Sequence, residues 1–164
     1  MQTEPFQLTK NELSKGLESI SNSIFGTKLI RYLGVFLTMI GVFGLYQYYE
    51  SDVTADFWSW FLPFFGLYLS FMPKINAYFQ ANQLIKSANH IAEVLTFSCD
   101  TEQYELKGEN FSSRIQWKSL KKVVFKKGLI LLFLTDRTAN ILPERVLSRE
   151  QLKSLKNVVA AGKK

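Results

Sequence analysis

Two long uncharged stretches dominate the pattern of hydrophobic and polar residues along this chain of 164 residues. The first covers residues 32–49, which is 18 residues, and the second covers residues 57–73, which is 17 residues. As helices rising about 1.5 Å per residue, each would cross most of a hydrocarbon core of about 30 Å. Neither stretch has the polar face that a helix packed on a soluble core shows. The pattern therefore predicts a transmembrane helical hairpin over residues 29–73, with its turn at residues 50–56.

Small residues fall on one face of each predicted transmembrane helix, where they would let the two backbones approach closely in lipid. We expect the two helices to pack on each other through these faces, and Pro63 predicts a kink in the second helix. No ionisable residue lies inside either stretch, which argues against an ion or proton pathway. The small faces consist of Gly34, Thr38 and Gly41 in the first helix and of Ser59, Pro63, Gly66 and Ser70 in the second.

The hydrophobic period changes after the second stretch. Residues 74–90 contain no glycine or proline and predict a helical stalk that continues the second helix. From Ile91 the period is two, which predicts about six short antiparallel strands, and Leu129–Leu134 is apolar on both faces, as a fully buried strand is. A capping-box pattern at Ser148 predicts a final helix. The predicted fold class is an α+β membrane protein in which residues 91–164 form a small antiparallel β-barrel or curled sheet capped by a C-terminal α-helix.

Residues 1–28 precede the first apolar stretch and contain one clear helix start. Thr9 can cap this helix, and Glu12 can reach back to close a capping box. The apolar residues that follow make a narrow stripe, which indicates a helix that lies on the bilayer or on the β domain. The alternative is a helix that binds a partner protein.

The distribution of charge predicts the orientation in the membrane. The formal net charge is +6. Residues 50–56 carry three acids and no base, whereas residues 74–164 carry sixteen Lys or Arg against eight acids. Because basic flanks stay in the cytoplasm, we expect both termini there and the turn outside. Cys99 is the single cysteine, so no internal disulfide can form, in agreement with a reducing compartment.

Three segments of the β region resemble a known family. They are Ser-Arg-Ile-Gln-Trp-Lys-Ser-Leu-Lys-Lys-Val at residues 113–123, Ile-Leu-Pro-Glu-Arg at residues 141–145 and Leu-Ser-Arg-Glu-Gln-Leu at residues 147–152. Each is similar to a stretch of the YcxB-like membrane proteins of bacteria, and the order of helix, two spans and short-stranded β domain is similar too. The chain departs from the family pattern at Gln116, where proline is usual, and at Glu144, where lysine is usual.

The resemblance implies a pleckstrin-homology-like cytoplasmic domain tethered to the bacterial inner membrane, and it implies no enzymatic activity. Glu144 removes one positive charge from any anion site at that end of the strand. Filling a core and turning a strand into a helix are structural roles that account for the signature residues of the family. These residues are Trp117, Pro143, Arg145 and Ser148.

The residue inventory predicts no catalytic, cofactor or metal site. The chain has no glycine-rich phosphate loop and no Gly-x-Ser-x-Gly segment. One histidine and one cysteine cannot build the usual pair of nucleophile and base. His90 is expected to be structural because metal sites need clustered ligands. The acidic residues within 100–109 do not resemble a calcium loop, and much of this group is expected to face solvent.

A run of basic residues is the strongest candidate for a binding site. It brackets one predicted strand near a leaflet that carries anionic lipid, and each lysine at such a surface contributes about 1 kcal/mol of attraction. The alternative is an edge strand that its lysines protect against pairing with another sheet. Nucleic acid is disfavoured because exposed aromatic residues do not alternate with the lysines. The candidate lipid- or partner-binding residues are Lys118, Lys121, Lys122, Lys126 and Lys127.

These observations favour a non-enzymatic membrane-anchored protein whose cytoplasmic domain binds anionic lipid or a protein partner, the latter by accepting a strand at a sheet edge. The alternative is an immunity protein that protects a bacterium against a cognate toxin, a role that suits small, basic, non-catalytic membrane proteins. A subunit of an enzyme or of a transporter is a third hypothesis, which the missing chemistry disfavours.

Overall fold

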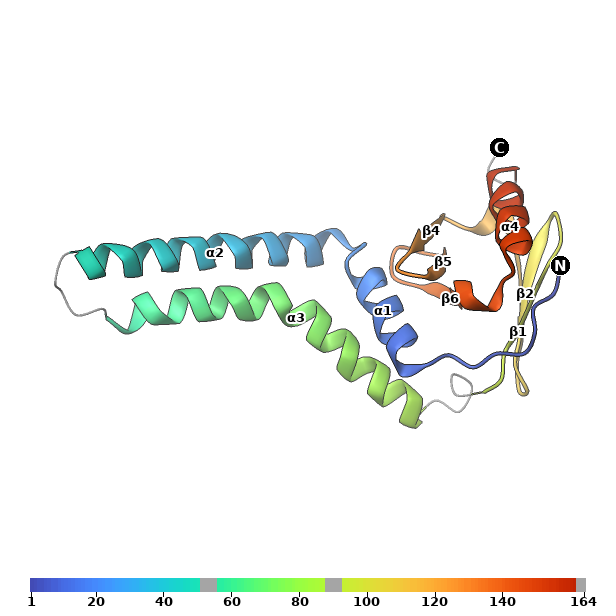
Figure 1. Ribbon diagram of the computed structural model, residues 1–164, viewed down its shortest axis with the longest axis horizontal. Coiled ribbons are helices and arrows are strands. Elements are labelled where there is room, and N and C mark those ends of the chain that lie inside the picture. The colour runs from blue at the N-terminus through green and yellow to red at the C-terminus, as the bar shows by residue number, and fades with distance from the viewer. Residues whose placement is uncertain (51–55, 88–92, 162–164) are drawn as a thin grey trace.

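A helical hairpin extends from one side of a domain that contains all the β-strands (Figure 1). The computed structural model describes residues 1–50, 56–87 and 93–161 of the chain. The hairpin consists of α2 (Phe25–Glu50) and the first half of α3 (Phe57–Ser87), whose second half runs on toward the domain.

The two helices of the hairpin pack through their small residues. A Cβ placed on Gly34 would lie 2.7 Å from the carbonyl oxygen of Gly66, and a Cβ on Gly66 would lie 2.5 Å from the backbone nitrogen of Thr38. A Cβ on Gly41 would overlap the ring of Pro63. Only glycine fits at these three positions without a shift of the neighbouring atoms. The predicted packing through small faces is confirmed.

Only one of the two predicted spans has the length and hydrophobicity of a membrane-crossing helix among the residues that the structure describes, and it is α2. The first half of α3 is uncharged from residue 57 to 73, but it includes Trp58, Trp60 and Pro63, which lower its hydropathy. Hydropathy therefore does not confirm the two-span hairpin. Residues 51–55 of its predicted turn lie outside the described residues.

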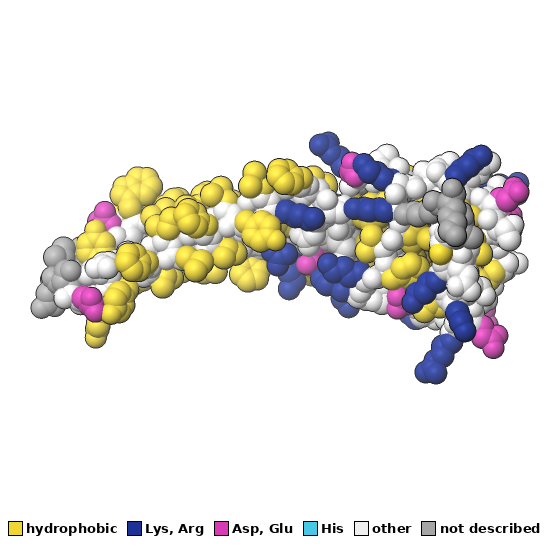
Figure 2. All heavy atoms as spheres, turned by 90° about the horizontal axis from the view of Figure 1, so that it is seen from above, with side chains coloured by type: hydrophobic (Ala, Val, Ile, Leu, Met, Phe, Trp, Pro, Cys, Tyr) yellow, Lys and Arg dark blue, Asp and Glu magenta, His cyan; other side chains and the backbone are white. Residues whose placement is uncertain are grey.

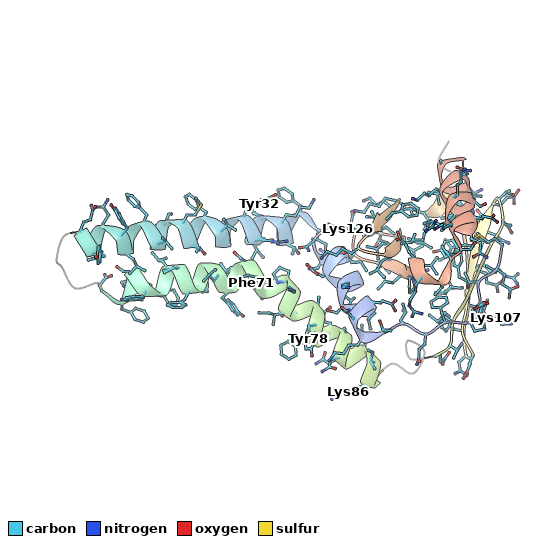
Figure 3. All side chains as sticks on the ribbon, viewed as in Figure 1. Tyr32, Phe71, Tyr78, Lys86, Lys107 and Lys126 are labelled. Carbon is cyan, nitrogen blue, oxygen red and sulfur yellow. The ribbon has the colours of Figure 1, made fainter. Side chains whose placement is uncertain are left out.

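Helix α3 bends where it leaves the hairpin. The bend lies between Phe71 and Tyr78 (Figure 3), a segment that contains Pro73. Proline lacks an N–H donor and its ring clashes with the carbonyl group four residues earlier, which favours a bend here. Pro63, where the sequence predicted the kink, instead packs against Gly41 of α2.

The β-strands form two separate three-stranded antiparallel sheets. The α+β class, the six strands and the final helix are confirmed, whereas a closed barrel is absent from the described residues because β3 and β4 do not pair. Between these strands the chain makes the short helix η2, which buries Trp117 and redirects the backbone. The first sheet contains β1 (Thr96–Cys99), β2 (Gln103–Lys107) and β3 (Ser112–Gln116), followed by η2 (Trp117–Ser119); the second contains β4 (Lys122–Lys126), β5 (Leu129–Phe133) and β6 (Ala139–Pro143), followed by η3 (Glu144–Val146) and α4 (Arg149–Ala161).

Two residues, Lys127 and Gly128, connect β4 to β5. Their φ angles are 56° and 75°, as the type I′ turn of a two-residue hairpin requires, and the register pairs Lys126 with Leu129. Glycine adopts this backbone conformation freely, whereas for lysine it costs about 1–2 kcal/mol. β4 and β5 thus form a tight hairpin, and its turn points toward the base of the helical hairpin (Figure 3).

Strand β5 is buried along its whole length, as the sequence predicted. Ile130 and Leu132 belong to a core shared with the first sheet and α4. Leu129, Leu131 and Phe133 belong to a second core shared with α1 and the second half of α3. Both faces of the second sheet are therefore covered by other elements.

Helix α1 (Lys10–Ser21) covers the second face of β5 and also contacts α3. Thr9 and Glu12 form the predicted capping box at its start. Gly16 lies so close to Ile141 of β6 that a Cβ would overlap the isoleucine side chain. Of the two positions that the sequence left open, bilayer or β domain, the structure therefore has α1 on the β domain.

Residues 1–6 run beside β1, which the sequence did not predict. The N–H of Thr3 donates to the carbonyl oxygen of Phe97 at 2.8 Å, and the backbones of Phe6 and Leu95 exchange hydrogen bonds of 2.8 and 2.7 Å. The Thr3 hydroxyl also bonds to the backbone of Phe97. The N-terminal segment thus covers the β1 edge of the first sheet, where a partner strand would otherwise be able to pair.

A side chain added at Gly34 should push the two helices of the hairpin apart. Gly34→Leu is expected to destabilise the protein by about 1–3 kcal/mol, the usual cost of overpacking. Gly44→Leu is the matched control, because a Cβ at Gly44 meets nothing within 4 Å. Thermal unfolding of the full-length protein in detergent, followed by tryptophan fluorescence, measures the difference. Equal unfolding midpoints for the two variants would contradict the close packing.

The β domain should not fold without α1, because one apolar face of β5 would then contact water. A chain of residues 93–164 is expected to aggregate or to melt without cooperativity in circular dichroism. A chain that joins residues 1–24 through a flexible linker to residues 74–164 keeps both faces covered and should melt cooperatively. Cooperative melting of the shorter chain would show that α1 is dispensable.

Candidate functional site

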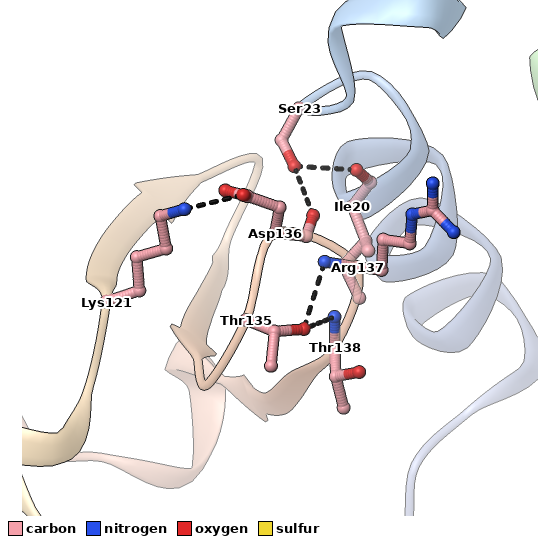
Figure 4. Close-up of polar contacts among 7 residues, drawn as sticks. All are labelled: Ile20, Ser23, Lys121, Thr135, Asp136, Arg137 and Thr138. Carbon is pink, nitrogen blue, oxygen red and sulfur yellow. Dashed lines mark hydrogen bonds and ion pairs between the residues drawn. The ribbon is translucent and has the colours of Figure 1, made fainter.

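The five candidate lysines have different surroundings in the structure. Lys118 lies on η2, at the end of the first sheet. Lys121 pairs with the carboxylate of Asp136 at 2.5 Å (Figure 4). The Nζ atom of Lys122 lies 4.3 Å from the ring centroid of Phe133. These three lysines therefore have different contacts, although the charges of Lys121 and Lys122 both act on Asp136.

Lys126 and Lys127 lie at the β4–β5 turn, beside the base of the helical hairpin (Figure 3). The Nζ atom of Lys127 is 3.1 Å from the carboxylate of Glu18 on α1. Lys127 is the one member of the candidate set that lines the groove described next.

An open groove of about 1000 Å³ lies between α1, α3 and the β4–β5 turn. We call it the juxtahairpin groove. The side formed by α1 is polar, whereas the side formed by α3 is mainly aromatic and aliphatic. The groove is lined by Asn11, Ser14, Lys15 and Glu18 of α1, by Phe71, Lys74, Ile75, Tyr78 and Phe79 of α3, and by Lys127 of the turn.

The juxtahairpin groove is positively charged. Its lining has three lysines against one glutamate, a net charge of +2. The glutamate is Glu18, which is paired with Lys127. Lys15 and Lys74 are exposed and take part in no ion pair within the described part of the chain. The groove therefore presents two ammonium groups whose charge no described carboxylate neutralises.

Several polar contacts fix the position of α1 at one end of the groove. The guanidinium group of Arg145 donates to the carboxylate of Glu12 at 2.6 Å and to the carbonyl oxygen of Gln7 at 2.8 Å. The ammonium group of Lys10 donates to the hydroxyl of Tyr78 on α3 at 2.9 Å, which lowers the pKa of Tyr78. These contacts join α1 to the β domain on one side and to α3 on the other.

A further contact lies just beyond the C-terminal end of α1. The hydroxyl of Ser23 donates to the carbonyl oxygens of Ile20 and Asp136 (Figure 4). The side chain of Asp136 pairs with Lys121, and this hydrogen bond lowers the pKa of Asp136. Lys121 thus helps to hold the β5–β6 loop against the start of the helical hairpin.

The four signature residues make contacts within the protein. Trp117 is buried, and its indole N–H donates to the carbonyl oxygen of Asp100 at 3.0 Å. Pro143 is buried at the end of β6. The Ser148 hydroxyl accepts a hydrogen bond of 3.2 Å from the backbone N–H of Gln151. In return, the side-chain oxygen Oε1 of Gln151 accepts one of 2.9 Å from the backbone N–H of Ser148. Arg145 pairs with the carboxylate of Glu12, as described above. A structural role therefore accounts for the surroundings of all four residues.

Several other polar residues in the described part of the chain form contacts within the protein. Within residues 1–50, 56–87 and 93–161, no group of three or more His, Cys, Asp or Glu could hold a metal ion. The carboxylate of Asp100 accepts hydrogen bonds from two backbone N–H groups of the β1–β2 turn, and these hydrogen bonds lower its pKa. Glu105 pairs with Arg114 at 3.2 Å. Burial raises the pKa of the Cys99 thiol. His90 lies outside the described residues.

Comparison with known proteins identifies the β domain. Residues 99–159, from the end of β1 to near the end of α4, match the family model described as YcxB-like protein. This region of the chain is therefore similar to the YcxB-like family. No curated protein and no solved structure matches the chain. Lys127 lies inside the YcxB-like region, whereas Lys15 and Lys74 lie outside it, so the groove combines residues of this region with residues of the flanking helices.

The ion pair between Arg145 and Glu12 should contribute to the docking of α1. Burial alone would raise the pKa of Glu12, but hydrogen bonds from Arg145 and Thr9 outweigh this effect and lower it. Since the lowered pKa favours the ionised form in the folded protein, this stabilisation is present at neutral pH and is lost as the pH falls through the lowered pKa of Glu12.

A double-mutant cycle of Arg145→Ala and Glu12→Gln tests this prediction. The coupling energy at pH 7, from thermal unfolding of the full-length protein in detergent, is expected to be about 1 kcal/mol. It should shrink toward zero when the pH falls below the ordinary pKa range of glutamate. A coupling energy that does not change with pH would show that the carboxylate charge of Glu12 is not involved.

Proposed function

We propose that this chain is a non-enzymatic membrane-anchored protein. In this proposal α2 and the first half of α3 cross the bacterial inner membrane as a two-span hairpin, and the pleckstrin-homology-like YcxB-like domain rests against the anionic lipid of the cytoplasmic leaflet. One observation carries the proposal. The apolar surface of the hairpin gives way, at its domain end, to a band of basic side chains (Figure 2).

The exposed surface of the hairpin supports two spans. Apart from Met1 and Val94, every exposed large hydrophobic side chain among the described residues lies on α2 or α3. Phe36 of α2 is 59% exposed and Phe64 of α3 is 66% exposed. Soluble monomers rarely leave so large an apolar surface in water. A lipid environment would cover it on both helices.

The contacts between α2 and α3 support the same conclusion. The backbone of Gly34 lies close to Gly66, and that of Gly41 lies close to Pro63. The uncharged segments of the two helices therefore pack directly on each other at these positions. If α2 crosses a bilayer, α3 has to share its surroundings. The tryptophans that lower the hydropathy of α3 are common at membrane interfaces, so they are compatible with a span.

The basic band supports a cytoplasmic domain that lies on the leaflet. Lys74 is the first charge after the uncharged segment of α3, and Arg31 is the last charge before that of α2. Basic residues that flank a span remain in the cytoplasm, and the leaflet there carries negative charge that attracts them. The exposed basic residues near this end of the hairpin are Lys15, Lys28, Arg31, Lys74, Lys126 and Lys127.

Strand capture at the β1 edge of the first sheet is disfavoured, because this edge already pairs with residues 1–6 of the chain itself. The other edge of this sheet is β3. The alternative of an immunity protein depends on size and charge alone, and the geometry of the groove adds nothing to it.

Fluorescent labels at two single cysteines, in a Cys99→Ser background, test the proposal in proteoliposomes. Lys126→Cys lies at the base of the hairpin and Lys107→Cys lies far from it (Figure 3). Lipids that carry a quencher on the headgroup should quench the first label more than the second. With phosphatidylglycerol present, this difference should increase, and it should fall at about 1 M salt, where the Debye length is about 3 Å.

The orientation is tested by a membrane-impermeant maleimide on intact cells. Val53→Cys, between α2 and α3, should react from outside, and Lys107→Cys should react only after permeabilisation. Reaction of both positions from the same side would contradict the two-span hairpin. Equal quenching of the two labels with neutral and anionic lipid would contradict the lipid contact, and a stoichiometric crosslinked protein would then favour partner binding.

A further inference from the structure

We propose that the juxtahairpin groove binds the phosphate-bearing headgroup of one anionic phospholipid. This inference rests on the proposed function, because the groove meets lipid only if the hairpin lies in a membrane. It goes beyond a diffuse attraction between a basic band and a leaflet, since it assigns one lipid molecule to one site built by α1, α3 and the β4–β5 turn.

The groove lies at the depth where a phospholipid carries its phosphate. Phe71 belongs to the uncharged segment of α3, and Lys74 is the first charged residue after it. Both line the groove, so the groove starts at the hydrocarbon boundary of the proposed span and opens away from it. A lipid next to α3 would have its acyl chains beside the uncharged segment and its phosphate at the level of Lys74.

The apolar side of the groove begins at the level of the acyl chains and continues beside the headgroup. Phe71, Ile75 and Phe79 follow one another at intervals of four residues and therefore share one face of α3. All three are exposed, at 55%, 42% and 61%. Tyr78 is held beside them by its hydrogen bond to Lys10. Phe71, at the hydrocarbon boundary, would contact the glycerol backbone and the first methylene groups of the lipid, whereas Ile75 and Phe79 follow Lys74 and would flank the headgroup.

The charge of the groove fits an anion. Lys15 from α1 and Lys74 from α3 have no carboxylate partner among the described residues, and they face the same hollow from opposite sides. Lys127 adds a third ammonium group whose position is fixed by Glu18. Asn11 and Ser14 add hydrogen-bond donors to the lining. A phosphodiester between the two helices could accept hydrogen bonds from both unpaired lysines, and its single negative charge would offset one of their two positive charges.

The conformation of Lys127 also agrees with a binding role. Its φ angle of 56° is one that asparagine or glycine adopts more readily in a type I′ turn. Lysine at this position places an ammonium group beside α1 at the expense of turn stability. Lys127→Asn therefore removes the charge while it keeps, or improves, the backbone of the turn.

Native mass spectrometry of the full-length protein in detergent, titrated with phosphatidylglycerol, tests the proposal. The wild-type protein is expected to retain one lipid at concentrations where further lipids dissociate. Lys15→Gln with Lys74→Gln should weaken this first binding step about tenfold or more, because two charges at an anionic headgroup are lost. Lys127→Asn should weaken it less, since Glu18 already neutralises this lysine in part.

The matched control is Lys118→Gln with Lys153→Gln, which removes the same charge from exposed positions outside the groove. It should bind the first lipid within about twofold of the wild type, as expected if only local charge matters. All four substituted lysines of the two double variants are exposed, and their thermal midpoints in detergent check that the fold is unchanged. Equal weakening in the two double variants, or none in either, would overturn the groove as a lipid site.

Two further arms identify the source of the anion. Phosphatidylcholine has a phosphate but no net charge, and it should bind clearly more weakly than phosphatidylglycerol. Inorganic phosphate at millimolar concentration should not displace the lipid, because it cannot cover the apolar side formed by α3. Displacement by inorganic phosphate would overturn the lipid in favour of a free anion. If the Lys126→Cys label is quenched as expected but the groove variant binds lipid like its control, the groove proposal fails and the proposed function stands.

Discussion

The arrangement of this protein depends on a single strand that is apolar on both faces. All five residues of β5 are buried, and burying a Leu, Ile or Phe side chain contributes about 1.5–3 kcal/mol. Burial of one face of β5 therefore contributes several kcal/mol of free energy. This is comparable with the whole free energy of unfolding of a small domain, about 5–15 kcal/mol. The first sheet and α4 cover one face. The other face must be covered by residues from outside the YcxB-like region, and α1 and α3 supply them.

This constraint joins the β domain to the helical hairpin. Because α1 covers β5 and also packs on α3, it holds the domain beside the base of the hairpin. Gly16 allows the close approach of α1 to Ile141, and the ion pair between Arg145 and Glu12 fixes the start of the helix. The ion pair is partly exposed and contributes little free energy by itself. Apolar burial thus provides the stability of this junction, and the polar contacts define its geometry.

Local signals in the sequence predicted the elements, but they did not predict the contacts that build the groove. Helix caps, the period of two and the Lys127–Gly128 turn depend on neighbouring residues, so they could be identified from the sequence. Residues 1–6 contain Pro5 and no alternation, and they make β-bridges to the first sheet only because the β1 edge lies beside them. The open sheets have a local origin instead, because β3 and β4 follow each other in the chain but the short helix η2 separates them.

The contacts of the candidate lysines also could not be predicted from the sequence. Lys121 and Lys122 are consecutive, but Lys121 precedes β4 and pairs with Asp136, whereas Lys122 begins β4 and lies over the Phe133 ring. Lys15 and Lys74 lie far apart in the sequence, and only the packing of α1 on α3 brings them to one groove. A signal for Lys74 was present, since it is the first charge after an uncharged stretch. Lys15 had no comparable signal, because its importance depends on which face of α1 covers β5.

The bend of α3 at Pro73 connects these two levels of structure. Before the bend α3 lies along α2, and after it α3 lies against α1 (Figure 1). A straight α3 would continue in line with the hairpin, away from α1, and Ala81 and Leu84 would lose their place beside β5. The bend therefore lets one continuous helix serve the hairpin and the core of the domain. It also places Phe71 and Lys74 on either side of Pro73, so the change from an apolar to a charged surface falls where α3 turns toward α1. The juxtahairpin groove is the space that this turn leaves between the two helices.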